Sequence, residues 1–248
     1  YTITTDYLGQ ITGGTKNDFI LRKTLKPIFH GSKMEIKREE LEYGYFSVGG
    51  HSMYLPKSHS EYSDGRIHWK ETVTARDSKG NIAEFTETGC PTKVIIWSYN
   101  GQHPVAVIEN CTLAKVEEKL QGLLSIDSIT NSQEFTQRQQ EILNDTLRRL
   151  LPEAHITVYT YKLGIGVSSI TDLRGVKTTF EYDASGRLVS IKDTDGKTVE
   201  EYEYHFLNET NKNGLRCLKK RVYRDKGSTT YSEDVTYWNS LGLKEQEI

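Results

Sequence analysis

Side chains that could bind a metal ion or transfer a proton are spread thinly along the sequence. No two of the seven histidines have the spacing that places two metal ligands in one short motif. The segment from Asp193 to Gly196 opens like a calcium-binding loop, but Lys197 and the residues after it lack the later oxygen ligands. An Asp-Gly turn explains this segment more simply. We therefore predict no metal site and no cofactor, and we expect the histidines on sheet surfaces: His30, His51, His59, His68, His103, His155 and His205.

Signatures of covalent catalysis are equally weak. The serines form no Gly-x-Ser-x-Gly elbow, and Gly164-Ile165-Gly166 lacks the remainder of a phosphate-binding loop. Glu200 and Glu201 are neighbours on an expected strand, so their carboxylates point to opposite faces and cannot act as an acid–base pair. The sequence predicts no catalytic residue. A hydrolase whose site is assembled from scattered residues is the least favoured hypothesis.

The residues with the most potential for binding are aromatic. Exposed rings along strands can stack against sugar rings or partner side chains. Rings that hold successive hairpins together would follow the same pattern, and we favour this packing role. A carbohydrate- or peptide-binding module is the alternative, and exposure of several rings on one face would support it. The rings concerned are Trp69, Trp97, Tyr99, Tyr159, Tyr161, Tyr182, Tyr202, Tyr204 and Trp238.

The element that must position many of these residues is a predicted β-hairpin. Phe180 and Tyr182 share one face of its first strand, because strand side chains alternate between faces. Asp183 begins a tight turn, in which its carboxylate can accept backbone N–H bonds, and Gly186 supplies the positive φ that the turn needs. Leu188 then begins the return strand.

This hairpin recurs along the chain. Gly175 and Gly196 are 21 residues apart, as are Tyr161 and Tyr182. A fixed period of about 20 residues is typical of repeat architectures, in which each unit buries its apolar face against its neighbours. Looser copies occupy residues 76–82, 97–100 and 237–243. The residues predicted to have structural roles in the repeat are Asp77, Gly80, Tyr99, Tyr161, Gly175, Phe180, Tyr182, Asp183, Gly186, Arg187, Leu188, Gly196, Trp238 and Gly242.

The sequence Tyr182-Asp183, two spacer residues, Gly186-Arg187 and an aliphatic strand resembles the signature of bacterial YD-repeat or RHS (rearrangement hot spot) proteins. The resemblance covers residues 50–248, with Arg76, Asn100 and Trp238-Asn239 in place of the expected Tyr or Asp. It implies a non-enzymatic segment of a larger exported bacterial surface or secreted protein. Proteins of this family build a spiralling β-sheet shell, and some enclose a C-terminal toxin. The segment would act as shell or display scaffold, with the rest of its own chain, a cargo domain or a surface glycan as partner.

The apolar period changes between residues 113 and 152. Leu113–Leu124 and Glu134–Leu151 are predicted helices, with Asn131 as an N-terminal cap and Pro152 after the end. Their apolar stripe must be buried, so we expect a helical hairpin packed across one sheet face. A coiled-coil partner site is the alternative, although the stripe lasts only about two and a half heptads.

Composition and charge argue against several partners. The 248 residues are 35% hydrophobic, and their net charge is −2 with positive and negative residues interleaved. Such a chain presents no basic footprint for nucleic acid. It also lacks a run of about 18 apolar residues, which a membrane-spanning helix needs.

The predicted fold is mainly β with minor α. Antiparallel hairpin repeats are expected to form a curved sheet or partial β-shell that carries the inserted helical hairpin. We predict three regions: an N-terminal β-hairpin region with degenerate YD repeats (1–112), the helical hairpin (113–152) and a YD-repeat β region (153–248). The last region ends with the start of a strand that has no partner, so we expect the natural protein to continue past Ile248.

Overall fold

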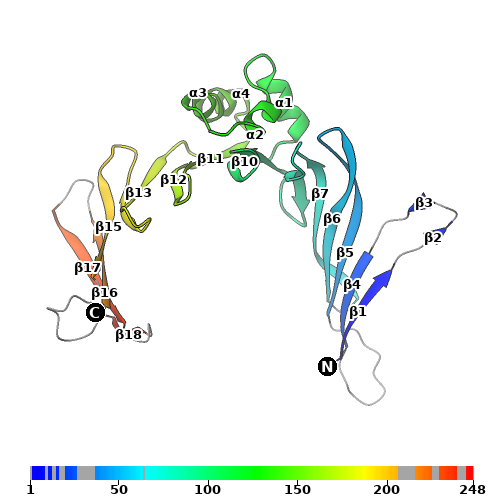
Figure 1. The fold of residues 1–248 in the computed structure, drawn as a ribbon, viewed down its shortest axis with the longest axis horizontal. Coiled ribbons are helices and arrows are strands. Elements are labelled where there is room, and N and C mark those ends of the chain that lie inside the picture. Colours follow the sequence, from blue (N-terminus) through cyan, green and yellow to red (C-terminus); the bar gives the residue numbers. More distant parts are fainter. Residues whose placement is uncertain are drawn as a thin grey trace. The chain divides into compact units, whose positions relative to one another are not determined.

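The chain folds into two compact units, Tyr1–Ile156 and Thr157–Ile248. The computed structural model describes residues 2–8, 11–12, 15–16, 20–26, 37–63, 65–205, 216–224, 229–238 and 244–247. Both units consist mainly of antiparallel strands, and helices are few (Figure 1). The predicted fold class, mainly β with minor α, is thereby confirmed. The predicted division into regions 1–112, 113–152 and 153–248 stays a prediction.

Strands of the first unit pair with their neighbours in chain order. Each pair is antiparallel, so the chain passes back and forth as a meander. A short ribbon of β2 (Ile11–Thr12) and β3 (Thr15–Lys16) stands apart from this ladder. The ladder contains β1 (Thr2–Leu8), β4 (Ile20–Lys26), β5 (Lys37–Val48), β6 (His51–Ser63), β7 (Arg66–Arg76), β8 (Ile82–Glu87), β9 (Lys93–Ser98) and β10 (His103–Glu109).

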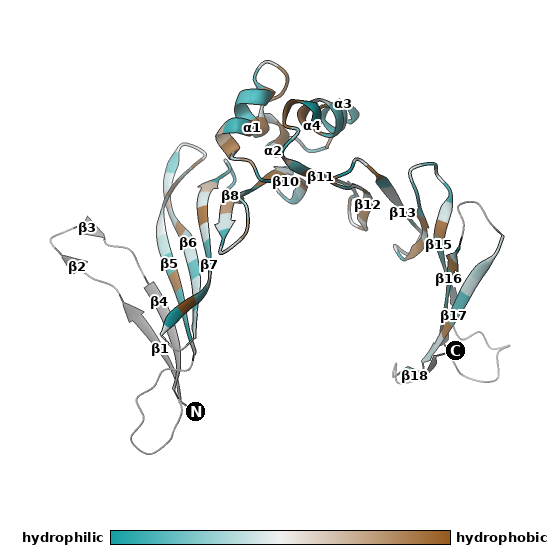
Figure 2. Ribbon diagram, turned by 180° about the vertical axis from the view of Figure 1, so that it is seen from behind, coloured by the Kyte–Doolittle hydropathy of each residue, from teal (hydrophilic) through white to brown (hydrophobic). Residues whose placement is uncertain are grey.

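Five short helical segments follow β10. They are α1 (Leu113–Leu120), α2 (Ile126–Thr130), α3 (Gln137–Glu141), the π-helix η1 (Ile142–Leu147) and α4 (Arg148–Leu150). The last three run on without a break, and the helices alternate between hydrophilic and hydrophobic stretches (Figure 2). Wide π turns of this kind are rare inside helices.

The prediction of a simple two-helix hairpin was wrong in two respects. The first predicted helix ends at Leu120, because Gly122 takes a φ of 77° and turns the chain toward α2. Asn131 ends α2 and does not cap the next helix. The cap is Thr136, whose hydroxyl accepts from the Gln139 N–H while the Gln139 side chain accepts from the Thr136 N–H.

The core of the first unit lies between these helices and the last strands of its sheet. α2 contacts β9, and alternate residues of β9 are buried. Because each fully buried large apolar side chain contributes roughly 1.5–3 kcal/mol, this layer is the main source of stability in the unit. Its fully buried side chains include Val94, Ile96, Val105, Ile108, Val116, Leu120, Ile129, Leu143, Leu147 and Leu151.

Polar contacts fasten the helical segments to the sheet. The Glu84 carboxylate on β8 accepts hydrogen bonds from the backbone N–H of Leu113, at 2.5 Å, and from the Thr74 hydroxyl, at 2.6 Å. A carboxylate at the first turn of α1 also interacts favourably with the helix dipole. The Asn131 amide lies 3.2 Å from the Ser78 hydroxyl, which ties the end of α2 to the turn after β7.

The second unit is also an antiparallel meander, with strands again paired in chain order. Its strands are β11 (His155–Lys162, which starts at the end of the first unit), β12 (Gly166–Thr171), β13 (Lys177–Tyr182), β14 (Leu188–Lys192), β15 (Thr198–His205), β16 (Arg216–Tyr223), β17 (Tyr231–Trp238) and β18 (Lys244–Glu247). None of the helices in the described part of the chain has the length and apolar character needed to cross a membrane.

The two faces of this second sheet differ in character. Phe180 is paired with Ile191, and Tyr182 with Leu188, so aromatic and aliphatic side chains gather on one face. Polar and charged residues meet on the other, where Glu201 is paired with Arg221 and Arg221 with Glu233. Alternation of this kind follows from the two-residue period of a strand.

Candidate functional site

Four turns with the sequence Asp-x-x-Gly have the same hydrogen bonds. In each, the aspartate Oδ1 accepts from the backbone N–H groups two and four residues later, at 2.8–3.0 Å. The glycine N–H donates to the aspartate carbonyl at 2.9–3.1 Å, and the glycine φ lies between 77° and 90°. The aspartate carboxylate therefore accepts hydrogen bonds from backbone N–H groups that have no carbonyl partner in the turn. The glycine takes a backbone conformation that other residues rarely adopt. The turns are residues 77–80, 172–175, 183–186 and 193–196.

The spacing of these turns explains the period of the sequence. Asp172, Asp183 and Asp193 begin three successive turns, which join β12 to β13, β13 to β14 and β14 to β15. The turns therefore lie alternately at the two ends of the strands. Two such turns make up the 21-residue repeat. Thr194 links turns that share an end of the sheet, since its hydroxyl both accepts from the Lys177 N–H and donates to the Lys177 carbonyl, at 3.0 Å each.

Arg187 connects its own turn to the next aromatic residue. Its Nε lies 2.7 Å from Asp183 Oδ2, and its guanidinium stands 4.8 Å from the centroid of the Tyr204 ring. The Tyr204 hydroxyl in turn donates to the Leu188 carbonyl at 2.9 Å. The Asp, Gly, Arg and Tyr of the repeat thus form one connected group that spans neighbouring hairpins.

The tyrosine–carbonyl bond recurs. Tyr182 donates to the Val167 carbonyl at 2.8 Å, as Tyr204 does to Leu188. In the first unit the Trp97 indole N–H donates to the Ile82 carbonyl at 2.8 Å. Gly166 leaves room for this arrangement, because a Cβ on it would lie 3.0 Å from the Tyr182 hydroxyl.

The charge of Asp183 gives the turn a pH dependence. The hydrogen bond from the Arg187 side chain is the main reason why the pKa of the Asp183 carboxyl is below its ordinary value, and backbone N–H groups add to the effect. Because the folded-state pKa is below the unfolded value of about 3.9, the stabilisation is present above that pH and is lost as the pH falls through the folded-state pKa.

We expect the melting temperature of the wild-type protein to fall more steeply than that of Asp183→Asn between about pH 5 and pH 2, the range in which the unfolded-state and then the folded-state carboxyl is protonated. Asparagine keeps the side-chain oxygen that accepts the backbone bonds but has no charge to lose. Thermal unfolding followed by circular dichroism at each pH measures both curves. Parallel curves would show that the charge contributes nothing.

Other predicted repeat residues have different surroundings. Tyr99 is buried with a φ of 53°, and Asn100 follows with a φ of 57°, so this copy forms no Asp-x-x-Gly turn. Tyr161 is half-buried on β11 and is paired with Val167. Trp238 is the last residue of β17, and Gly242 lies outside the described residues.

Several residues of these linked hairpins were not predicted. Asp172 and Asp193 have the same role as Asp183, and their spacing could have identified them. Asn81 is the counterpart of Arg187 in the first unit: its amide donates to Asp77 Oδ2 at 3.0 Å and to the Gly101 carbonyl at 2.9 Å. No sequence signal pointed to that second contact.

The aromatic residues suggested for ligand binding are packed. Of the nine rings, Tyr99 is buried and the other eight are half-buried, so none is fully presented to solvent. At least three of them, Trp97, Tyr182 and Tyr204, use their polar atom on backbone carbonyls. This favours the packing role over the binding role for this set of rings.

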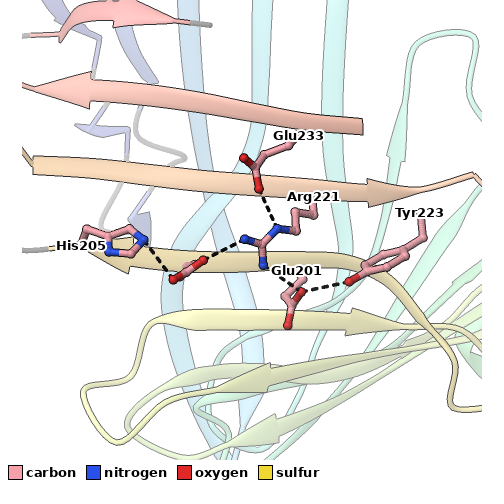
Figure 3. Close-up of polar contacts among 6 residues, drawn as sticks. Glu201, His205, Arg221, Tyr223 and Glu233 are labelled. Carbon is pink, nitrogen blue, oxygen red and sulfur yellow. Dashed lines mark hydrogen bonds and ion pairs between the residues drawn. The ribbon is translucent and has the colours of Figure 1, made fainter. Parts of the chain in front are cut away.

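A charged cluster crosses β15, β16 and β17 on the polar face of the second sheet (Figure 3). Arg221 lies between Glu233, at 2.7 Å, and Glu203, at 3.0 Å, and contacts Glu201 at 3.5 Å. The hydrogen bond that Arg221 donates to the Glu233 carboxylate is the main cause of the raised pKa of Arg221. Tyr223 donates to Glu201 at 3.0 Å, and His205 lies 3.0 Å from Glu203.

This cluster is suited to holding strands together. One guanidinium reaches carboxylates on both neighbouring strands, and charge-assisted bonds of this type are stronger than neutral ones. Within the described residues, no group of three or more His, Cys, Asp or Glu side chains could hold a metal ion.

One family model matches part of the second unit. The family model described as RHS Repeat matches residues 166–198, the segment that contains the turns at Asp172, Asp183 and Asp193. No curated protein matches the sequence. A similar solved structure is the crystal structure of TcdB2-TccC3 without its hypervariable C-terminal region, with a TM-score of 0.37 and 12% identity. That alignment covers 90% of this chain and only 12% of the other, so the chain spans about an eighth of that structure's length.

Proposed function

We propose that this chain, an RHS-repeat protein, is a wall segment of a larger exported bacterial surface or secreted protein. Its role is to form part of a shell or display scaffold. Its partners are the rest of its own longer chain, and a cargo domain or surface glycan that the scaffold encloses or presents. The proposal assigns no catalytic residue.

The observation that carries the proposal is the double connection between neighbouring hairpins. Strands are joined by backbone ladders, and side chains such as Arg187 and Tyr204 then bind one hairpin to the next. Sheets whose repeats each contact only their neighbours can be extended by adding further repeats. A wall built in this way needs no central core.

The charged cluster supports the same mechanical role. Arg221 and its carboxylates reinforce the β15–β17 ladder on the face opposite Phe180, Tyr182 and Tyr204. Cross-strand contacts are thus present on both faces, since Lys220 pairs with Glu200 at 3.0 Å on the other side. Cross-strand pairs of this kind are the unit of stabilisation in a sheet.

The test is the location and size of the native polypeptide. The producing bacterium is fractionated, and peptides of this chain are followed by mass spectrometry together with the intact mass of the species that carries them. We expect an exported species with a mass well above 28.4 kDa. A species confined to the cytoplasm would contradict the proposed export, and an exported species of about this mass would leave no cargo to enclose.

A further inference from the structure

The far end of the β5–β6 hairpin projects past β7 as a two-stranded ribbon. The pairing of β6 with β7 covers only Ser58–Ser63, whereas β5 and β6 stay paired as far as Val48 and His51. Figure 1 shows these two strands side by side as a long hairpin. The two faces of the ribbon are therefore available for different contacts.

One face of this ribbon packs in part against the turn at Asp77, while Met53 on the same face stays 43% exposed. Val48 is 6% exposed and lies against Gly80 of the Asp77 turn. Arg76 places its guanidinium 5.0 Å from the Phe46 ring and donates to the Pro56 carbonyl at 2.6 Å. This contact fixes the ribbon and leaves its opposite face pointing away from the turn.

The opposite face of the ribbon carries tyrosines, although charged residues are more common at solvent-exposed strand positions. Tyr45 is 52% exposed, and its ring lies 4.9 Å from that of Tyr54. The Tyr43 ring is stacked on Tyr54, with 5.8 Å between centroids and 29° between planes. By the strand pairing this face, here called the tyrosine strip, consists of Tyr43, Tyr45, Ser47, Ser52, Tyr54 and Pro56.

The composition of the tyrosine strip defines its ligand. None of its six side chains is charged, although 27% of the chain is, so the strip does not select an ionic partner. It offers aromatic faces beside hydroxyl groups. A sugar ring has the complementary surface, since it presents C–H groups on its faces and hydroxyls at its edge. A peptide added as a strand would instead need the free backbone groups of a sheet edge.

We propose that the tyrosine strip is a binding site for neutral glycans, with Tyr45 as the principal stacking residue. This goes beyond the wall role and uses none of the half-buried repeat aromatics. The sugar stacks on the exposed ring of Tyr45, while the exposed Ser47 and Ser52 hydroxyls beside it bind its hydroxyl groups. Tyr43 and Tyr54 hold the Tyr45 ring in position.

Affinity electrophoresis in gels that contain laminarin, galactomannan or arabinoxylan tests the proposal. We expect at least one of these polysaccharides to retard the intact chain. Tyr45→Ala should weaken binding about tenfold, because one aromatic stacking contact is lost, while Tyr45→Phe keeps the ring and most of the affinity. The matched control is Tyr231→Ala, which removes a 44% exposed tyrosine of the second unit and should leave the retardation unchanged.

Three results would overturn the proposal. They are retardation by none of the three polysaccharides, equal weakening by Tyr45→Ala and Tyr231→Ala, and retardation that Tyr45→Ala leaves intact. A separate experiment measures the sedimentation of the chain without sugar. A dimer that Tyr45→Ala dissociates would place a second copy on the strip and exclude the glycan.

Discussion

Replacing Leu147 with alanine is expected to lower the free energy of unfolding of the first unit by about 2–5 kcal/mol. Leu147 lies in η1 and is fully buried. Truncation removes apolar contacts and leaves a cavity that a packed layer fills only in part. Urea titration, with hydrogen exchange of peptides from β9 and β10 as the probe, measures the loss in this unit.

Leu150 provides the matched control for this change. It is three residues away and 39% exposed, so Leu150→Ala should cost less than about 1 kcal/mol. Equal losses for the two variants would mean that the helices do not pack on the sheet through the Leu147 side.

Gly186→Val is expected to destabilise the second unit by more than about 1 kcal/mol. Gly186 has a φ of 77°, which a β-branched residue adopts only with strain. Space is not the obstacle, because an added Cβ would lie 3.7 Å from the Ile165 side chain, an ordinary contact. Thermal unfolding, together with hydrogen exchange of peptides from β13 and β14, reports the effect.

Gly186→Asn separates backbone strain from a general intolerance of side chains. Asparagine enters the left-handed region more readily than other non-glycine residues, so this variant should lie between wild type and Gly186→Val. If valine left the melting temperature unchanged, the turn would not depend on its positive φ.

Short-range features of the fold could be predicted from the sequence. The hairpin around Asp183 and Gly186 is encoded by residues within four positions of each other, whose turn chemistry does not depend on the rest of the chain. The fold class follows from the same signals. Helical segments do follow Leu113, because their apolar period is distinct from that of strands, although their number and ends differ from the two predicted helices.

Longer-range features could not be predicted in the same way. Asn131 suits a helix start as well as a helix end, and only the packing of α2 decides for the end. Arg187 meets Tyr204 because the strand register, with its bulge between Ile191 and Lys192, brings them together. Pattern and spacing do not determine such a bulge.

Likewise, the tyrosine strip depends on which ribbon face the Asp77 turn covers. The sequence shows that Tyr43, Tyr45 and Tyr54 lie near one another along the chain, but not that Arg76 and Gly80 cover the opposite face. The exposure of Tyr45 beside the half-buried Tyr43 and Tyr54 is therefore a property of tertiary packing rather than of local sequence.

The pairing of each strand with its neighbour in the chain also sets the order of assembly. A meander has a low contact order, so each hairpin can form as soon as its own residues leave the ribosome. The helical segments of the first unit are different, because the contact between Ser78 and Asn131 joins residues 53 positions apart. The apolar face of β9 and β10 thus stays uncovered until those helices have been synthesised, and this interval is when the nascent chain is most exposed to aggregation or to capture by a chaperone.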